Sequence, residues 1–218
     1  IKGVRNLEFE IEGDVFVRDD GSTESYEFGI EPFGMTFDSL DKFTLYAERN
    51  FEDLLSPFQI VPGVTIAAGE YTFDAYGVRF ETNSSRKYSV DGRLQTGEFY
   101  DGDRDAVRFS FLARPNRFLR SETSWEWNEI DLPSGSFHTS IVRERLGLAW
   151  SPRLRADAFI QYNDLAELFG LNVRLNWIYR PGADLFVVYN QNWDAPSLSD
   201  LDSRDHQFVV KFTYLFQK

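Results

Sequence analysis

His138 and Ser140 are of the residue types that ester hydrolysis uses, and they lie two positions apart in the sequence. A histidine that accepts the proton of a serine hydroxyl turns that hydroxyl into a nucleophile. A third residue must then orient the imidazole, and the sequence names no candidate for that role. We therefore expect no enzymatic activity, and a lipid hydrolase that uses these two residues is the alternative.

Two groups of carboxylates are the next candidates for chemistry. Asp101, Asp103 and Asp105 alternate as in a calcium loop, but the glycine and the bidentate glutamate of an EF-hand do not follow them. Glu122 and Glu126 could serve glycoside hydrolysis only on the two sides of a cleft. We expect a solvated acidic loop at the first group and a charged strand face at the second, with no metal and no cofactor.

The composition excludes several classes of protein. The 218 residues include no Cys, which removes disulfides, thiolate metal sites and thiol nucleophiles. A net charge of -12 argues against a nucleic-acid partner, because phosphate binding needs a basic surface. With 42% hydrophobic and 17% aromatic residues the chain must fold. It starts at Ile1 without an initiator Met, so we expect a processed chain or the carboxy-terminal part of a longer one.

Hydrophobic and polar residues alternate along most of the chain, as in β-strands that have one apolar face. Near the carboxyl terminus, Phe208, Val210 and Phe212 alternate with Gln207 and Lys211. The pattern predicts twelve strands in a single domain, 1–218, near 4–18, 25–33, 41–50, 69–82, 86–98, 105–114, 117–130, 136–150, 153–163, 169–180, 184–193 and 205–217. Most are as long as the ~9 to 11 residues that cross a membrane at a tilt, whereas soluble strands average ~5 to 6.

The predicted connections differ in length. Compact turns with Pro, Gly or Asn lie at 114–116, 151–153 and 181–183, and longer loops lie between them at 131–135, 164–168, 194–204 and 51–69. Tight turns at one end and long loops at the other are typical of a transmembrane β-barrel. We therefore expect an all-β, antiparallel, up-and-down transmembrane barrel of about 12 strands. A soluble ligand-binding β-barrel is the alternative.

The two faces of the predicted strands differ in composition. The apolar face carries aromatic residues near the strand ends, where they would form membrane girdles: Trp125, Trp127, Trp150, Tyr162, Trp177, Tyr179, Tyr189, Tyr214 and Phe216. The other face would line the lumen with acids from early strands and mainly arginines from later ones: Glu8, Glu10, Glu12, Glu27, Glu31, Arg93, Arg108, Glu122, Glu126, Arg143, Arg145, Arg155 and Arg174. These charges either create a transverse field across a pore or pair and fill a plugged barrel.

Two positions break the alternation. Glu144 falls on the apolar face, which predicts a bulge near Arg143 or a place close to the lipid headgroups. The apolar phase of the strand at 69–82 shifts between Ala75 and Val78, which predicts a β-bulge at Gly77.

The chain resembles bacterial outer-membrane proteins in its last strand, where Phe212, Tyr214 and Phe216 alternate as in the closing signal that the barrel assembly machinery recognises. A second resemblance, to the carboxy-terminal barrel of an uncharacterised outer-membrane family, rests on Pro57-Phe58-Gln59-Ile60, Gly69-Glu70-Tyr71, Ser151-Pro152-Arg153-Leu154, Gln161-Tyr162-Asn163, Arg180-Pro181-Gly182-Ala183-Asp184-Leu185-Phe186 and Val188-Tyr189-Asn190. Longer members of that family carry an amino-terminal carbohydrate-binding-like domain. The resemblance implies a location in the outer membrane and supplies no catalytic residues.

These observations lead to one functional expectation. We expect a narrow passive channel in the outer membrane, or a membrane anchor and scaffold for a protein partner or for an amino-terminal domain. The other expected partners are outer-membrane lipid and lipopolysaccharide, and the barrel assembly machinery during insertion.

Overall fold

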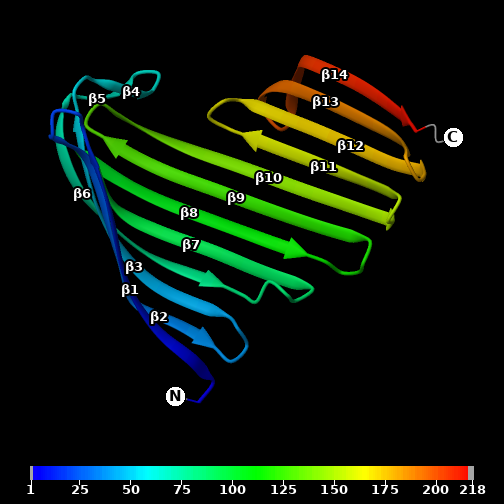
Figure 1. The fold of residues 1–218 in the computed structure, drawn as a ribbon. Helices are drawn as coiled ribbons and strands as arrows, with labels where there is room; N and C mark the ends of the chain where they lie inside the picture. The colour runs from blue at the N-terminus through cyan, green and yellow to red at the C-terminus, as the bar shows by residue number, and fades with distance from the viewer. Residues whose placement is uncertain (1, 216–218) are drawn as a thin grey trace. The chain divides into compact units, whose positions relative to one another are not determined.

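The computed structural model describes residues 2–215, and their secondary structure consists of fourteen β-strands (Figure 1). The strands are β1 (Val4–Val17), β2 (Thr23–Phe37), β3 (Lys42–Leu54), β4 (Phe58–Val61), β5 (Val64–Ile66), β6 (Gly69–Glu81), β7 (Tyr88–Phe99), β8 (Gly102–Ala113), β9 (Leu119–Leu132), β10 (Gly135–Ser151), β11 (Leu154–Asn163), β12 (Leu168–Arg180), β13 (Ala183–Ser197) and β14 (Asp200–Tyr214). Among these residues no helix is long and apolar enough to cross a membrane.

Twelve of the strands form one sheet, in the order β1-β2-β3-β6-β7-β8-β9-β10-β11-β12-β13-β14, and β4 pairs with β5 separately. The prediction of an all-β chain with twelve long antiparallel strands is confirmed. The strands β4 and β5 lie inside the connection predicted at 51–69. They were missed because four and three residues are too few to show a period of two.

The described chain divides into two compact units. Unit 1 comprises residues 2–83, 91–109 and 127–138, and unit 2 comprises 84–90, 110–126 and 139–215. The division runs through β7 to β10 and not through a linker. Each unit is therefore described by itself below.

Strand register gives each unit one polar and one apolar face. In unit 2, Arg145 pairs with Phe159, which pairs with Asn172, so these three side chains lie on one face. The next row, Leu146, Ala158 and Val173, lies on the other face and is apolar. In unit 1 the row Glu12, Gly29 and Glu48 belongs to the polar face, and the row Ile30 and Ala47 belongs to the apolar face.

The best-packed core of unit 1 lies at one end of its strands. Val64 and Ile66 of β5 and Ile130 and Leu132 of β9 are buried together, with Tyr71 and several other partly buried residues against them. Tyr71 pairs with Glu52, which lies on the same face of β3 as Glu48. The β4–β5 hairpin therefore packs over one end of the polar face of unit 1.

The predicted alternation of tight turns and long loops is wrong. Residues 100–101, 133–134 and 198–199 are short connections, and the acidic, Ser-rich stretch predicted as a loop at 194–204 belongs mostly to β13 and β14. Asp194 pairs with Asp202 and Ser197 with Asp200, so the hairpin continues through this stretch, with two register shifts. Strand segments that are polar on both faces carry no alternation, and sequence reasoning reads them as loops.

The β-bulge predicted at Gly77 is absent, and the register of β10 with β11 shows none near Arg143. The register of β3 with β6 runs without a shift from Lys42 to Leu54, and Gly77 pairs directly with Tyr46. The register of β10 with β11 is continuous from Ile141 to Ala149, so Glu144 lies on the apolar face in the middle of its strand. Register shifts occur elsewhere, for example between Ile30 and Phe33 in the pairing of β2 with β3 and between Ala149 and Ser151 in the pairing of β10 with β11.

Candidate functional site

The polar face of unit 1 collects most of the acids that were predicted to line a lumen. Glu8, Glu10, Glu12, Glu27 and Glu31 lie on this face of β1 and β2, as their mutual register shows. Arg93 pairs with Arg79, which pairs with Thr44, so β3, β6 and β7 extend the same face.

Arg108 lies four residues after Arg104 in β8, and strand alternation gives the two arginines one face. The Arg104 guanidinium donates to the amide oxygen of Asn128 at 2.7 Å.

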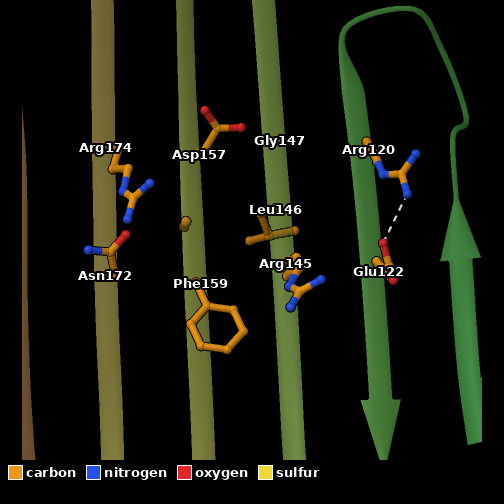
Figure 2. Close-up of a pocket in the computed structure, with 10 residues that line it drawn as sticks. Arg120, Glu122, Arg145, Leu146, Gly147, Asp157, Phe159, Asn172 and Arg174 are labelled. Atoms are coloured by element: carbon orange, nitrogen blue, oxygen red, sulfur yellow. Dashed lines mark hydrogen bonds and ion pairs between the residues drawn. The ribbon is translucent and has the colours of Figure 1, made fainter. Parts of the chain in front are cut away.

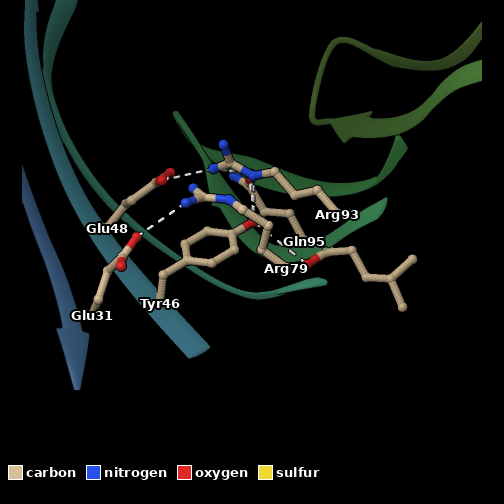
Figure 3. A network of polar contacts seen from close by, with 7 residues as sticks. Glu31, Tyr46, Glu48, Arg79, Arg93 and Gln95 are labelled. Carbon is tan, nitrogen blue, oxygen red and sulfur yellow. Dashed lines mark hydrogen bonds and ion pairs between the residues drawn. The ribbon is translucent and has the colours of Figure 1, made fainter. Parts of the chain in front are cut away.

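Two arginines of this face, Arg79 and Arg93, form a network around Tyr46 (Figure 3). Arg79 pairs with Glu31 at 3.1 Å, and Arg93 pairs with Glu48 at 2.7 Å. Arg93 also donates from Nε to the Tyr46 hydroxyl at 2.6 Å. Both guanidinium groups lie near the Tyr46 ring, with Cζ 5.5 Å and 4.4 Å from its centroid. Each of these two arginines therefore has a carboxylate and an aromatic partner, and all of these partners belong to unit 1.

The polar face of unit 2 carries the remaining predicted residues. Arg143 pairs with Glu126 at 3.1 Å, and Arg120 pairs with Glu122 at 2.9 Å. Arg155 faces the same way, in the row that pairs Ala149, Arg155 and Asn176.

A hollow of about 690 Å³ opens on the polar face of unit 2 (Figure 2). It is lined by Arg120, Glu122, Arg145, Leu146, Gly147, Asp157, Ala158, Phe159, Asn172 and Arg174. The strands β10, β11 and β12 run side by side beneath it, and Gly147 leaves its floor open. The nearest atom to a Cβ at position 147 would be the Asp157 carboxylate oxygen, at 3.5 Å.

The arginines of this hollow differ in their partners. Arg120 is paired with Glu122, whereas among residues 2–215 neither Arg145 nor Arg174 has a carboxylate within 4 Å. The guanidinium of Arg145 lies 5.4 Å from the centroid of the Phe159 ring. Asp157 pairs in register with Arg174 but likewise forms no ion pair with a described residue. The hollow thus presents three guanidinium groups against two carboxylates.

The aromatic residues predicted to form girdles lie on the apolar face. At the end of unit 2 where Pro181 makes its turn, this face carries Trp150, Trp177, Tyr179 and Tyr214. The Tyr179 ring stacks on Phe212 at 5.6 Å. Phe216 lies outside the described residues.

Other aromatic residues lie farther along the same strands. Tyr162 pairs with Phe169 near the other end of β12. The ring centroids of Phe169 and Trp193 are 5.3 Å apart. Tyr189 lies in the middle of β13 and donates to the side chain of Gln191. Trp193, which was not singled out from the sequence, alternates on β13 in phase with Tyr189, and this phase could have identified it.

Trp125 and Trp127 lie two residues apart on β9 and so share a face. The Trp125 indole donates to the Ser140 hydroxyl at 3.1 Å, which places Trp125 beside the start of β10 in unit 2. Trp127 belongs to unit 1.

Glu144 has polar partners on this apolar face. The hydroxyl groups of Ser121 and Thr123 donate to its two carboxylate oxygens at 2.6 Å and 2.5 Å. Ser121 and Thr123 are themselves two residues apart on β9. A carboxylate among apolar rows is therefore satisfied by two hydroxyl donors, and this explains how β10 keeps its register without a bulge.

The structure gives several of the candidate catalytic and metal-binding residues other contacts or positions. The Ser140 hydroxyl accepts the hydrogen bond from Trp125, and its backbone N–H donates to Asp164. Asp103 and Asp105 lie in β8 and not in a loop. Within residues 2–215 no three His, Asp or Glu side chains are grouped so that they could hold a metal ion.

Comparison with known proteins does not identify a family for this chain. No protein-family model matches the chain, and no curated protein or solved structure is significantly similar to it. The resemblance to outer-membrane proteins stays a prediction from the sequence.

Proposed function

We propose that the chain forms the wall of a transmembrane β-barrel in an outer membrane and acts as a narrow passive channel. The supporting observation is the exposure of the apolar face. Trp177 lies on β12, between two paired neighbours, and is nevertheless 47% exposed, and Trp150 on β10 is 53% exposed. Large contiguous apolar surfaces are not left in water, and hydrocarbon is the environment that this face fits.

The polar faces favour contact with water. Across each face run rows of Glu, Arg and Asn side chains, and the hollow in unit 2 is open between them. In a barrel whose apolar face meets lipid, these rows line the lumen. An open, charged lumen wall fits passage of small polar solutes.

A scaffold or membrane anchor is the second candidate function, and unit 1 favours it. There Arg79 and Arg93 are paired with carboxylates of the same unit, and the β4–β5 hairpin covers one end of the polar face. Paired charges and an apolar cover are features of a filled barrel. Conductance separates the two candidates.

Both edge strands bear on how such a barrel would close. Every residue of β14 is exposed, and so is every residue of β1 except the half-buried Val4. Unpaired backbone groups cannot remain in hydrocarbon. We therefore propose that β1 and β14 take partner strands in the membrane, either each other or strands from elsewhere.

The proposed partners follow from the location. Outer-membrane lipid and lipopolysaccharide would contact the apolar face, and the barrel assembly machinery would act on the last strand. We propose no enzymatic function, because the Ser140 hydroxyl accepts a hydrogen bond from the Trp125 indole and the sequence names no residue to orient a histidine base.

Gel mobility tests the barrel. The purified chain, folded in detergent, should migrate differently before and after boiling, because a closed barrel resists detergent until heated. Identical migration would count against the barrel and favour a soluble β-structure. Planar bilayers then test the channel: steady conductance supports it, and silence at high protein load leaves the scaffold.

A further inference from the structure

Some arginines of the two polar faces differ in their partners. In unit 1, Arg93 has a carboxylate at 2.7 Å, a phenol at 2.6 Å and an amide oxygen at 3.0 Å. In unit 2, Arg145 and Arg174 have no carboxylate among the described residues, although both lie on the polar face at the same hollow. A charge network with a purely structural role would pair each of its cations with an anion. Arg145 and Arg174 have no such partner among the described residues, and this favours binding of an anion from outside the chain.

The arrangement of the hollow favours one class of anion. Arg145 on β10 and Arg174 on β12 flank β11, and adjacent strands lie ~4.8 Å apart, so two long side chains can reach one group above β11. Guanidinium groups bind phosphate and carboxylate oxygens through paired N–H donors. Asn172 lies in the row of Arg145; its amide nitrogen donates one hydrogen to Asn190 and has a second hydrogen for a ligand.

The remaining lining residues limit what else could bind. Asp157 and Glu122 are the two carboxylates, and Glu122 is already paired with Arg120. The volume of about 690 Å³ lies within the range of small-molecule sites, roughly 300–1,000 Å³. Phe159 offers an apolar edge for the rest of a solute. The hollow therefore fits a small molecule that carries one phosphate-type group.

We propose that Arg145 and Arg174 form the anion-binding part of a solute site that takes a small phosphate-bearing molecule. The inference rests on the proposed function, since the polar face must meet water for a solute to reach it. The inference specifies the class of solute that the channel would bind: oxyanions bind in this hollow, and the charge of Asp157 limits their affinity.

Titration calorimetry with inorganic phosphate on the detergent-folded protein tests the site directly. The double variant Arg145→Gln/Arg174→Gln should weaken phosphate binding at least tenfold. Arg153→Gln removes the same charge at the exposed turn after β10, and it should bind like the unmodified protein. If the double variant and the control bind alike, the arginines do not form the site.

A variant with higher phosphate affinity provides a test that misfolding cannot explain. Asp157→Asn removes the unpaired carboxylate of the hollow, so phosphate should bind severalfold more tightly, which damage to the fold cannot produce. Unchanged or weaker binding by Asp157→Asn overturns the inference. If the gel mobility changes on boiling but none of these substitutions changes phosphate affinity, the proposed site is wrong and the proposed function stands. If the gel mobility does not change on boiling, the proposed function is wrong.

Discussion

The aromatic ring of Tyr46 lies directly over Gly77, its partner on the neighbouring strand. A Cβ at position 77 would lie 2.2 Å from the Tyr46 ring and 2.5 Å from the carbonyl oxygen of Leu94. Phe80 covers Gly92 in the same way. The glycine that suggested a bulge in the sequence therefore makes room for a 5%-exposed tyrosine, around which the arginines of unit 1 are arranged.

Gly77→Ala should lower the free energy of unfolding by about 1–3 kcal/mol, because the Leu94 carbonyl belongs to the backbone and cannot move aside. Urea unfolding followed by tryptophan fluorescence measures this change. Gly13→Ala is the matched control, since its Cβ would meet Phe28 at an ordinary 3.4 Å. Equal stability of the two variants would contradict the packing of Tyr46 over Gly77.

Glu144→Leu should stabilise the protein in phospholipid vesicles by about 1–2 kcal/mol, because a carboxylate on a lipid-facing strand costs more free energy than its hydrogen bonds from Ser121 and Thr123 return. The same change on the polar face, Glu122→Leu, leaves Arg120 without its partner and should cost about 0.2–1 kcal/mol. Unfolding by urea in vesicles gives both values. Opposite signs for the two variants support the assignment of the faces, and a destabilised Glu144→Leu would argue against lipid at β10.

Ile66→Ala should release the β4–β5 hairpin. Ile66 is 1% exposed within the apolar cluster, and truncation of such a side chain costs about 2–5 kcal/mol. Limited proteolysis should then cut within residues 55–68 far faster than in the unmodified protein. Leu55→Ala, at a 76%-exposed position of the same connection, should leave the cleavage rate unchanged. Rapid cleavage of the unmodified protein would contradict the packed hairpin.

The region around Tyr100 should lose stability in alkaline solution. Burial, and then the hydrogen bond that its hydroxyl donates to Glu52 at 2.6 Å, raise the pKa of Tyr100 above its ordinary value of 10.0. The folded state therefore favours the neutral phenol. This contribution is complete below pH 10 and is lost as the pH rises through the raised value.

Thermal unfolding at pH 8 and pH 11 should show this loss in the unmodified protein and a smaller loss in Tyr100→Phe. Glu52→Gln keeps an acceptor but removes the charge, and it should give an intermediate result. If Tyr100→Phe loses as much stability as the unmodified protein, another group governs the alkaline transition.

The sequence predicts the strands and their faces because both depend on a local period of two. Phe208, Val210 and Phe212 show that period plainly, and in the structure they pair with Tyr189, Val187 and Leu185, which lie on one face of β13. Segments without the period were misassigned. The polar end of the β13–β14 hairpin was read as a loop, and β4 and β5 were too short to detect.

Which charges pair could not be predicted, because pairing depends on cross-strand register and on side-chain reach. Arg93 and Glu48 lie on strands separated by β6, yet they meet across it. Arg145 and Arg174 look the same as Arg93 in the sequence, and only the three-dimensional arrangement reveals that they have no carboxylate partner among the described residues. The partners of Glu144 were missed for the same reason, since Ser121 and Thr123 come from another strand.

The acidic side chains of the β1–β2 hairpin make its folding depend on counterions. Glu8, Glu10, Glu12 and Asp14 follow one another on one strand face, with Glu27 opposite Asp14, and none of them forms an ion pair with a described residue. Successive carboxylates on a strand face lie ~6.6 Å apart, within the Debye length of ~10 Å at 0.1 M salt. Added salt should therefore help this hairpin to form, and it should weaken the binding of phosphate by the arginines of unit 2. Refolding yield and ligand affinity would then respond to ionic strength in opposite directions.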